Sequence, residues 1–137
     1  MAPPPNPYQG ITVLVIEDEP NTRLLIKRLL LQIGIISVVE AADGKAGLDE
    51  TMRAKPTIIL CDVHMEPIDG RQFLKTLRGL KMRQIATTPV IFLTADAKAD
   101  TVIFAKEHRI DGYLVKPVSL TQLKSRIDAL LKGPAPA

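Results

Sequence analysis

Short runs of apolar, often β-branched residues alternate along the chain with segments in which apolar residues recur every three or four positions. The runs predict buried strands, and the periodic segments predict amphipathic helices. The predicted strands are residues 11–16, 35–39, 58–61, 89–93 and 112–115. The predicted helices are residues 20–33, 43–53, a segment beginning at Asp69–Gly70, and residues 96–108 and 119–131, with a polar connection at 81–88. This order predicts an α/β fold, a doubly wound five-stranded parallel sheet with five helices.

The length of 137 residues and the hydrophobic content of 46% predict one domain with a single core. Residues 1–10 hold four of the eleven prolines and predict a disordered N-terminal arm. Residues 132–137 predict a disordered tail, which leaves residues 11–131 as the folded domain. The formal net charge of +3 comes from scattered basic residues, so direct nucleic-acid binding is not expected. The N-terminus resembles no signal peptide and no apolar run could span a membrane, so a soluble, cytoplasmic protein is expected.

Polar residues capable of chemistry follow the predicted strands. Glu17 and Asp18 follow the first strand, Asp62 the third, and Thr94 and Lys116 the fourth and fifth. The carboxyl edge of a parallel sheet is where sites of α/β proteins form, so these side chains are expected to meet there. Gathered carboxylates repel one another unless a cation lies among them, and an oxygen-only cluster favours Mg²⁺.

The set of groups suits phosphoryl transfer. Asp62 stands alone at the end of the central strand and is the candidate nucleophile, whereas the acidic pair suits a metal. Lys116 supplies a positive charge for phosphoryl oxygens, and Thr94 supplies a hydroxyl. Each residue alone would be ordinary: a turn aspartate, a strand-end threonine, a surface lysine. Their occurrence together at the ends of the strands is a far more specific indication of phosphoryl transfer than any one of them.

The chain resembles the receiver domain of bacterial two-component response regulators, in particular the single-domain chemotaxis type, from about Ile11 to Leu131. The resemblance rests on Val15 to Pro20, Cys61 to Met65 with Ile68 to Gly70, Leu93 to Ala95, and Gly112 to Pro117. It implies a flavodoxin-like sheet of order 2-1-3-4-5.

The resemblance also implies a phosphoacceptor and a metal site. Asp62 would be phosphorylated by a histidine of a sensor histidine kinase or a histidine phosphotransfer protein. Mg²⁺ would be held by Asp18, Asp62 and the backbone carbonyl of His64, with Glu17 acting through water. The protein would be a signalling switch with intrinsic autophosphatase chemistry, and not an enzyme.

The same comparison implies the parts of a switch. Thr94 and Lys116 would bind the phosphoryl group, Ala95 would leave it accessible, and Tyr113 would swing inward when Thr94 moves. The change would reach the surface of the last two βα units, which would bind a downstream protein of unknown identity.

Two departures from the family pattern lie in the site loops. The proline usual after Met65 is one place later, so Glu66 intervenes before Pro67 and adds a carboxylate near the site. Glu17 stands where aspartate is commoner, which a water-mediated ligand tolerates.

His64 and Asp96 lie two residues beyond Asp62 and Thr94, at positions that vary in the family. We expect their side chains to flank the path of the hydrolytic water and to set the lifetime of phospho-Asp62. The alternative is that His64 only faces solvent, as loop histidines often do.

The first helix presents a candidate docking patch. Its predicted inward stripe consists of Leu25, Ile26, Leu29 and Ile33. Leu24 and Leu31 then face outward, flanked by Arg23, Lys27 and Arg28, which predicts an apolar centre with a basic rim.

The sequence also leaves other functions to be compared with this one, and two of them fit it poorly. The chain could be a receiver fragment of a larger response regulator, or a receiver-like binding module without phosphorylation. A phospho-aspartate phosphatase needs its nucleophile after the first strand and usually a cap insertion. A flavodoxin needs a phosphate loop after Ile16, where Glu17, Asp18 and Glu19 would repel a phosphate.

Overall fold

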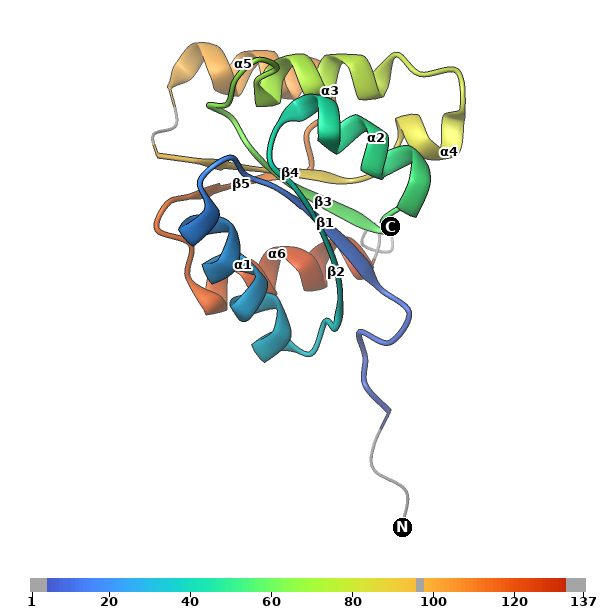
Figure 1. Cartoon of the computed structure of the whole chain (residues 1–137), viewed down its shortest axis with the longest axis vertical. Helices are drawn as coiled ribbons and strands as arrows, with labels where there is room; N and C mark the ends of the chain where they lie inside the picture. The colour runs from blue at the N-terminus through green and yellow to red at the C-terminus, as the bar shows by residue number, and fades with distance from the viewer. Residues whose placement is uncertain (1–4, 96–97, 133–137) are drawn as a thin grey trace, which may run out of the picture.

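Five parallel strands form the centre of the protein (Figure 1). The computed structural model describes residues 5–95 and 98–132. The strands are β1 (Thr12–Ile16), β2 (Ser37–Ala41), β3 (Ile58–Asp62), β4 (Val90–Thr94) and β5 (Gly112–Val115). They pair in the order β2-β1-β3-β4-β5, which confirms the predicted topology. Each residue of β3 and β4 is buried, as their unbroken apolar runs predict.

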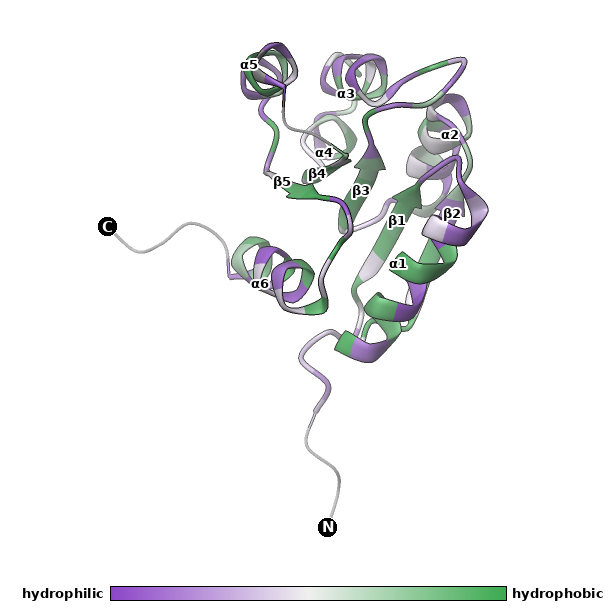
Figure 2. Cartoon of the chain, turned by 90° about the vertical axis from the view of Figure 1, so that its left-hand side faces the viewer, coloured by the Kyte–Doolittle hydropathy of each residue, from purple (hydrophilic) through white to green (hydrophobic). Residues whose placement is uncertain are grey.

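Helices cover both faces of the sheet (Figure 1). They are α1 (Pro20–Ile33), α2 (Gly44–Ala54), α3 (Gly70–Arg78), α4 (Arg83–Ala86), α5 (Ala99–Glu107) and α6 (Leu120–Leu131). α1 and α6 pack on one face, and α2, α3, α4 and α5 lie on the other. The strands β1, β3, β4 and β5 between them are mostly hydrophobic, as Figure 2 shows. Two apolar cores therefore hold the central strands rigidly from both sides.

The predicted count of five helices was wrong, because the described residues contain six. The polar connection expected at 81–88 holds the one-turn helix α4. Ile85 and Ala86 of this helix are buried against the core. A single turn has no apolar period, and no side chain caps its N-terminus, so the sequence carries no signal for it.

The core of α1 differs from the predicted stripe. Leu25 was expected to face inward but is 47% exposed, whereas Ile26 and Leu30 are buried. The buried pair is spaced by four residues, so the stripe is centred on it and Leu25 lies to one side. Leu120, the first residue of α6, is also exposed.

Part of the N-terminal segment packs against the folded domain, although its proline-rich composition predicts a separate arm. Tyr8 is 6% exposed and packs in the core between the sheet and the α1–α6 layer. Its hydroxyl donates to Asp128 Oδ1 at 2.7 Å. The Asn6 side chain donates to the carbonyl of Gly34, the residue that ends α1 with a φ of 116°. The buried aromatic ring anchors a segment whose prolines alone suggest an unattached arm.

Replacing Tyr8 by alanine is expected to lower the free energy of unfolding by about 3 kcal/mol, because a buried aromatic ring is lost. Tyr8→Phe should cost about 1 kcal/mol, since only the hydrogen bond is removed. Urea unfolding checks both values. The neighbouring Gln9 is exposed, so Gln9→Ala serves as the control. Equal effects of Tyr8→Ala and Gln9→Ala would show that the segment adds no stability.

Candidate functional site

Parallel pairing brings the ends of four strands to one edge of the sheet. Ile16 lies level with Cys61, and Thr94 with Val115. The residues that end or follow these strands are Glu17, Asp18, Asp62, Thr94 and Lys116. The structure thus places at one edge the five residues that the sequence assigned to it.

A lysine lies between two buried carboxylates at this edge. Lys116 Nζ is 2.8 Å from Glu17 Oε1 and 3.2 Å from Asp62 Oδ1. Glu17 is 1% and Asp62 5% exposed, whereas Asp18 is exposed. Burial lowers the pKa of Lys116, but its hydrogen bond to Glu17 and the charge of Asp62 raise the pKa above its ordinary value. Lys116 is therefore held as an ammonium beside the candidate nucleophile.

The carboxylates fit a hard divalent cation. One ligand oxygen from each of Glu17, Asp18 and Asp62 lies within 4.8 Å of the other two. Burial, and then the neighbouring Asp62, raise the pKa of Glu17 to about 7, which Lys116 only partly offsets. Glu17 Oε2 is also buried without a hydrogen-bond partner among the described residues. A buried carboxylate left in this way is relieved by a cation, and the all-oxygen donor set suits Mg²⁺.

The loop after Asp62 is fixed by the start of α3. Asp69 caps this helix in a capping box with Gln72. The Gly70 amide donates to the Val63 carbonyl at 2.8 Å. A Cβ on Gly70 would overlap the Asp62 carbonyl oxygen, so only glycine allows this close approach. His64 lies exposed in this loop, and the predicted use of its carbonyl as a metal ligand stays a prediction.

The residues of the predicted switch lie on β4 and β5. Thr94 is buried at the end of β4, and its carbonyl accepts the Lys116 amide at 2.7 Å. Ala95 follows it and is exposed. The Tyr113 ring packs edge-on against Phe92, with centroids 6.3 Å apart. The Tyr113 hydroxyl donates to the Val102 carbonyl of α5 at 2.9 Å, so Tyr113 connects β5 to α5. Asp96 lies outside the described residues.

The candidate docking patch is partly as predicted. Leu24 and Leu31 are exposed on α1, and Leu25 joins them. Two basic residues of the predicted rim are already paired with a carboxylate of this chain and are less available to a partner than expected. Arg23 Nε and Lys27 Nζ lie 3.4 and 3.5 Å from the Glu40 carboxylate at the end of β2.

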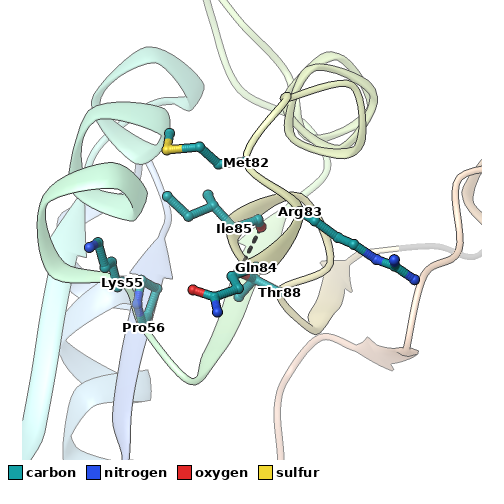
Figure 3. A pocket seen from close by; sticks show the side chains of 7 residues that line it. All are labelled: Lys55, Pro56, Met82, Arg83, Gln84, Ile85 and Thr88. Carbon is teal, nitrogen blue, oxygen red and sulfur yellow. Dashed lines mark hydrogen bonds between the residues drawn. The ribbon is translucent and has the colours of Figure 1, made fainter.

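Two hollows differ in their relation to the acidic cluster. One, of about 440 Å³, is shallow and is lined by Asp18, His64, Met65, Glu66 and Asp69. Asp18 is the member of the acidic cluster that lines it. The other, of about 500 Å³, lies where β3 and β4 begin (Figure 3) and is lined by Lys55, Pro56, Met82, Arg83, Gln84, Ile85 and Thr88. Figure 3 shows the Gln84 carboxamide directed toward the Lys55–Pro56 turn and the Arg83 side chain extending away. No carboxylate lines this second hollow, so it is no candidate phosphoacceptor site.

The doubly wound sheet and the acid–lysine cluster at its carboxyl edge define the class: a flavodoxin-like α/β protein with a buried aspartate placed for phosphoryl transfer. The chain belongs to the response regulator receiver domain family, whose sequence model matches residues 13–128. As a receiver domain, it is a signalling switch and not a conventional enzyme.

Individual relatives agree with this assignment. The chain is 27% identical over 124 residues to chemotaxis protein CheY-3 of Vibrio cholerae, covering 90% of this chain and 94% of that protein. It is 29% identical over 120 residues to chemotaxis protein CheY of Pseudomonas aeruginosa, covering 88% and 95%. Among solved structures, a putative response regulator from Chloroflexus aurantiacus matches with a TM-score of 0.80 at 27% identity, covering 89% and 98%. Vibrio cholerae CheY4 matches with a TM-score of 0.77 at 28% identity, covering 89% and 97%.

Within the described ranges, no helix combines the length and the apolar character needed to cross a membrane.

Proposed function

We propose that Asp62 accepts a phosphoryl group from a phosphohistidine in a Mg²⁺-dependent reaction. The donor would be a sensor histidine kinase or a histidine phosphotransfer protein, and this protein would receive the group in the cytoplasm. The observation that carries this proposal is the position of Asp62: it is buried, 3.2 Å from Lys116, and part of a cluster of three carboxylates. A nucleophile, a fixed ammonium and a cation site are the groups that phosphoryl transfer requires.

In the proposed step a carboxylate oxygen of Asp62 forms a bond to phosphorus as the bond from phosphorus to the histidine nitrogen breaks. The electron pair of the broken bond stays on the nitrogen, and the ring leaves as neutral imidazole when its other nitrogen carries a proton. Lys116 donates to a phosphoryl oxygen, and the Thr94 hydroxyl is a second donor from the next strand. Asp18, Asp62 and the His64 carbonyl would hold Mg²⁺, with Glu17 acting through water. The bound cation supplies charge neutralisation at the phosphoryl oxygens.

Incubation with acetyl phosphate and Mg²⁺ tests the proposal, with intact mass as the measurement. We expect the mass of one added phosphoryl group, and none when EDTA replaces Mg²⁺. Absence of the adduct under rapid quenching, with Mg²⁺ binding demonstrated separately, would leave a receiver-like binding module without phosphorylation.

Phosphorylation is proposed to change the surface formed by α5, β5 and α6, and so to regulate binding of a downstream protein. Ile103, Val115 and Leu120 expose apolar side chains there, one on each element. Tyr113 connects two of these elements through its hydrogen bond to Val102. Its ring would move inward as Thr94 turns toward the phosphoryl group, which would break that bond and release α5.

Replacement of His64 or Asp96 by alanine is expected to change the rate of phosphate loss from phospho-Asp62 severalfold. The reason is that their side chains would flank the water that attacks phosphorus. Release of inorganic phosphate after removal of the donor measures this rate. Unchanged rates in both variants would contradict the prediction, and Thr76→Ala, at an exposed position of the nearby α3, serves as the control.

Replacement of Leu24 by glutamate is expected to slow phosphoryl transfer from the kinase at least tenfold, because a charge enters the apolar centre of the docking patch. Labelling by acetyl phosphate should stay unchanged, since it needs no docking. Equal slowing of both reactions would instead indicate damage to the fold. Met52→Glu provides a matched control on α2, where Met52 is also an exposed apolar residue.

A further inference from the structure

Arg23 contacts the loop that carries the metal-binding acids. It lies in the first turn of α1, and its side chain is 21% exposed. Its Nη1 donates to the backbone carbonyl of Glu17 at 2.7 Å. Its Nε is 3.4 Å from Glu40 Oε1. The guanidinium is therefore directed toward the site loop and the end of β2, and not toward an approaching partner.

The bond to Glu17 fixes a particular peptide plane. The Glu17 carbonyl belongs to the planar group that joins Glu17 to Asp18, so its direction sets how the two side chains leave the backbone. The amide of Glu17 is also held, because it donates to the Ala41 carbonyl at 3.0 Å. Because the carbonyl and the amide of Glu17 are both hydrogen-bonded, the backbone conformation of the β1–α1 loop is fixed at Glu17, the first acidic residue of the cluster.

The backbone course of this loop matters for the three carboxylates of the cluster. Their ligand oxygens lie within 4.8 Å of one another, and like charges at that spacing repel. Asp18 is exposed, so the direction in which its side chain leaves the site loop depends on the course of its backbone. Arg23 holds that backbone without approaching the carboxylates, because Glu40 pairs with the guanidinium instead. The guanidinium therefore does not neutralise the carboxylates of the cluster, which remain able to bind a cation.

We infer that Arg23 is a positioning residue for the divalent-cation site: through the Glu17 carbonyl, it orients Asp18 toward the ion. This inference rests on the proposed Mg²⁺ dependence. It also reassigns a residue that the sequence placed on the rim of the docking patch. The two roles differ in outcome, since a docking residue affects transfer from the kinase but leaves metal affinity unchanged.

The test is a Mg²⁺ titration of the unphosphorylated protein, followed by amide chemical shifts. Arg23→Met should raise the dissociation constant roughly tenfold, as expected for loss of a group that orients a metal ligand. Lys27→Met is the matched control. Lys27 lies on α1, as Arg23 does, and also pairs with Glu40, but among the described contacts it has no hydrogen bond to Glu17. The control should bind Mg²⁺ as wild type does. Arg23→Gln, which also lacks the guanidinium, should match Arg23→Met.

A second readout separates positioning from general damage. With acetyl phosphate, Arg23→Met should need roughly ten times more Mg²⁺ for half-maximal labelling, yet reach the wild-type rate at saturating Mg²⁺. Wild-type affinity in both Arg23 variants, or a reduced rate that saturating Mg²⁺ does not restore, would overturn the inference. If the wild-type protein itself bound no Mg²⁺, the proposed Mg²⁺-dependent function would be wrong. If the wild-type protein bound Mg²⁺ and the Arg23 variants bound it equally well, only the role of Arg23 would be wrong.

Discussion

Asp62→Asn is expected to abolish labelling by acetyl phosphate, a loss of at least about 10³-fold, because the carboxamide is not a nucleophile toward phosphorus. The substitution keeps the size of the side chain. It removes one negative charge from a buried cluster in which Lys116 already pairs with Glu17 at 2.8 Å. The fold should therefore be retained, and relief of carboxylate repulsion should leave the free energy of unfolding unchanged or higher.

Intact mass after incubation with acetyl phosphate measures the loss, and Glu66→Gln provides the control. Glu66 lies in the same loop and is exposed beside the cluster, so the control also removes one acidic charge from this region. It should be labelled at the wild-type rate. An adduct of equal yield on Asp62→Asn would place the phosphoacceptor elsewhere and remove the central assignment.

The sequence predicted the strands other than β2, and the strand-end residues, well for a physical reason; β2 lies at Ser37–Ala41, two residues later than predicted. β3 and β4 are buried on both faces, so nearly all their positions must be apolar and the runs are unmistakable. In a parallel sheet the first polar residue after each run lies at the carboxyl edge. The convergence of Asp62, Thr94 and Lys116 follows from this topology alone. The 2-1-3-4-5 order needed the family resemblance, because periodicity does not distinguish strand orders.

The features that were missed depend on contacts between distant segments. α4 is one turn long, and its helical state depends on burial of Ile85 and Ala86. Tyr8 packs on a surface that forms only once α1 and α6 lie together. Arg23 could be placed on α1 from its position, but its bonds to Glu17 and Glu40 depend on where the loop and β2 end. Such contacts leave no local pattern in the sequence.

Arg78 is a further residue of this kind, and its replacement is expected to have the largest effect on stability. Its side chain is 6% exposed at the end of α3. The guanidinium donates, at 2.7–3.0 Å, to the carbonyl oxygens of Ala86, Thr88, His108 and Arg109. It also lies 3.2 Å from Asp111 Oδ2, which accepts the Val90 amide. One side chain thus joins the end of α3 to the connections that precede β4 and β5.

Arg78→Met should lower the free energy of unfolding by about 3–5 kcal/mol, because four carbonyl oxygens lose the Arg78 donor and the Asp111 carboxylate loses its paired cation. That is a large share of the roughly 5–15 kcal/mol typical of a domain. Arg78→Lys should cost nearly as much, since a single ammonium cannot span acceptors that the planar guanidinium reaches together.

Urea unfolding of both Arg78 variants, with Arg53→Met as control, measures these effects. Arg53 also pairs with a carboxylate, that of Glu50, but its side chain is 66% exposed. Its loss should change stability by no more than about 0.5 kcal/mol, as expected for surface ion pairs. If Arg78→Lys retained wild-type stability, the positive charge and not the set of hydrogen bonds would hold the end of α3 to the two connections. If Arg78→Met cost no more than Arg53→Met, the network would add nothing to the fold.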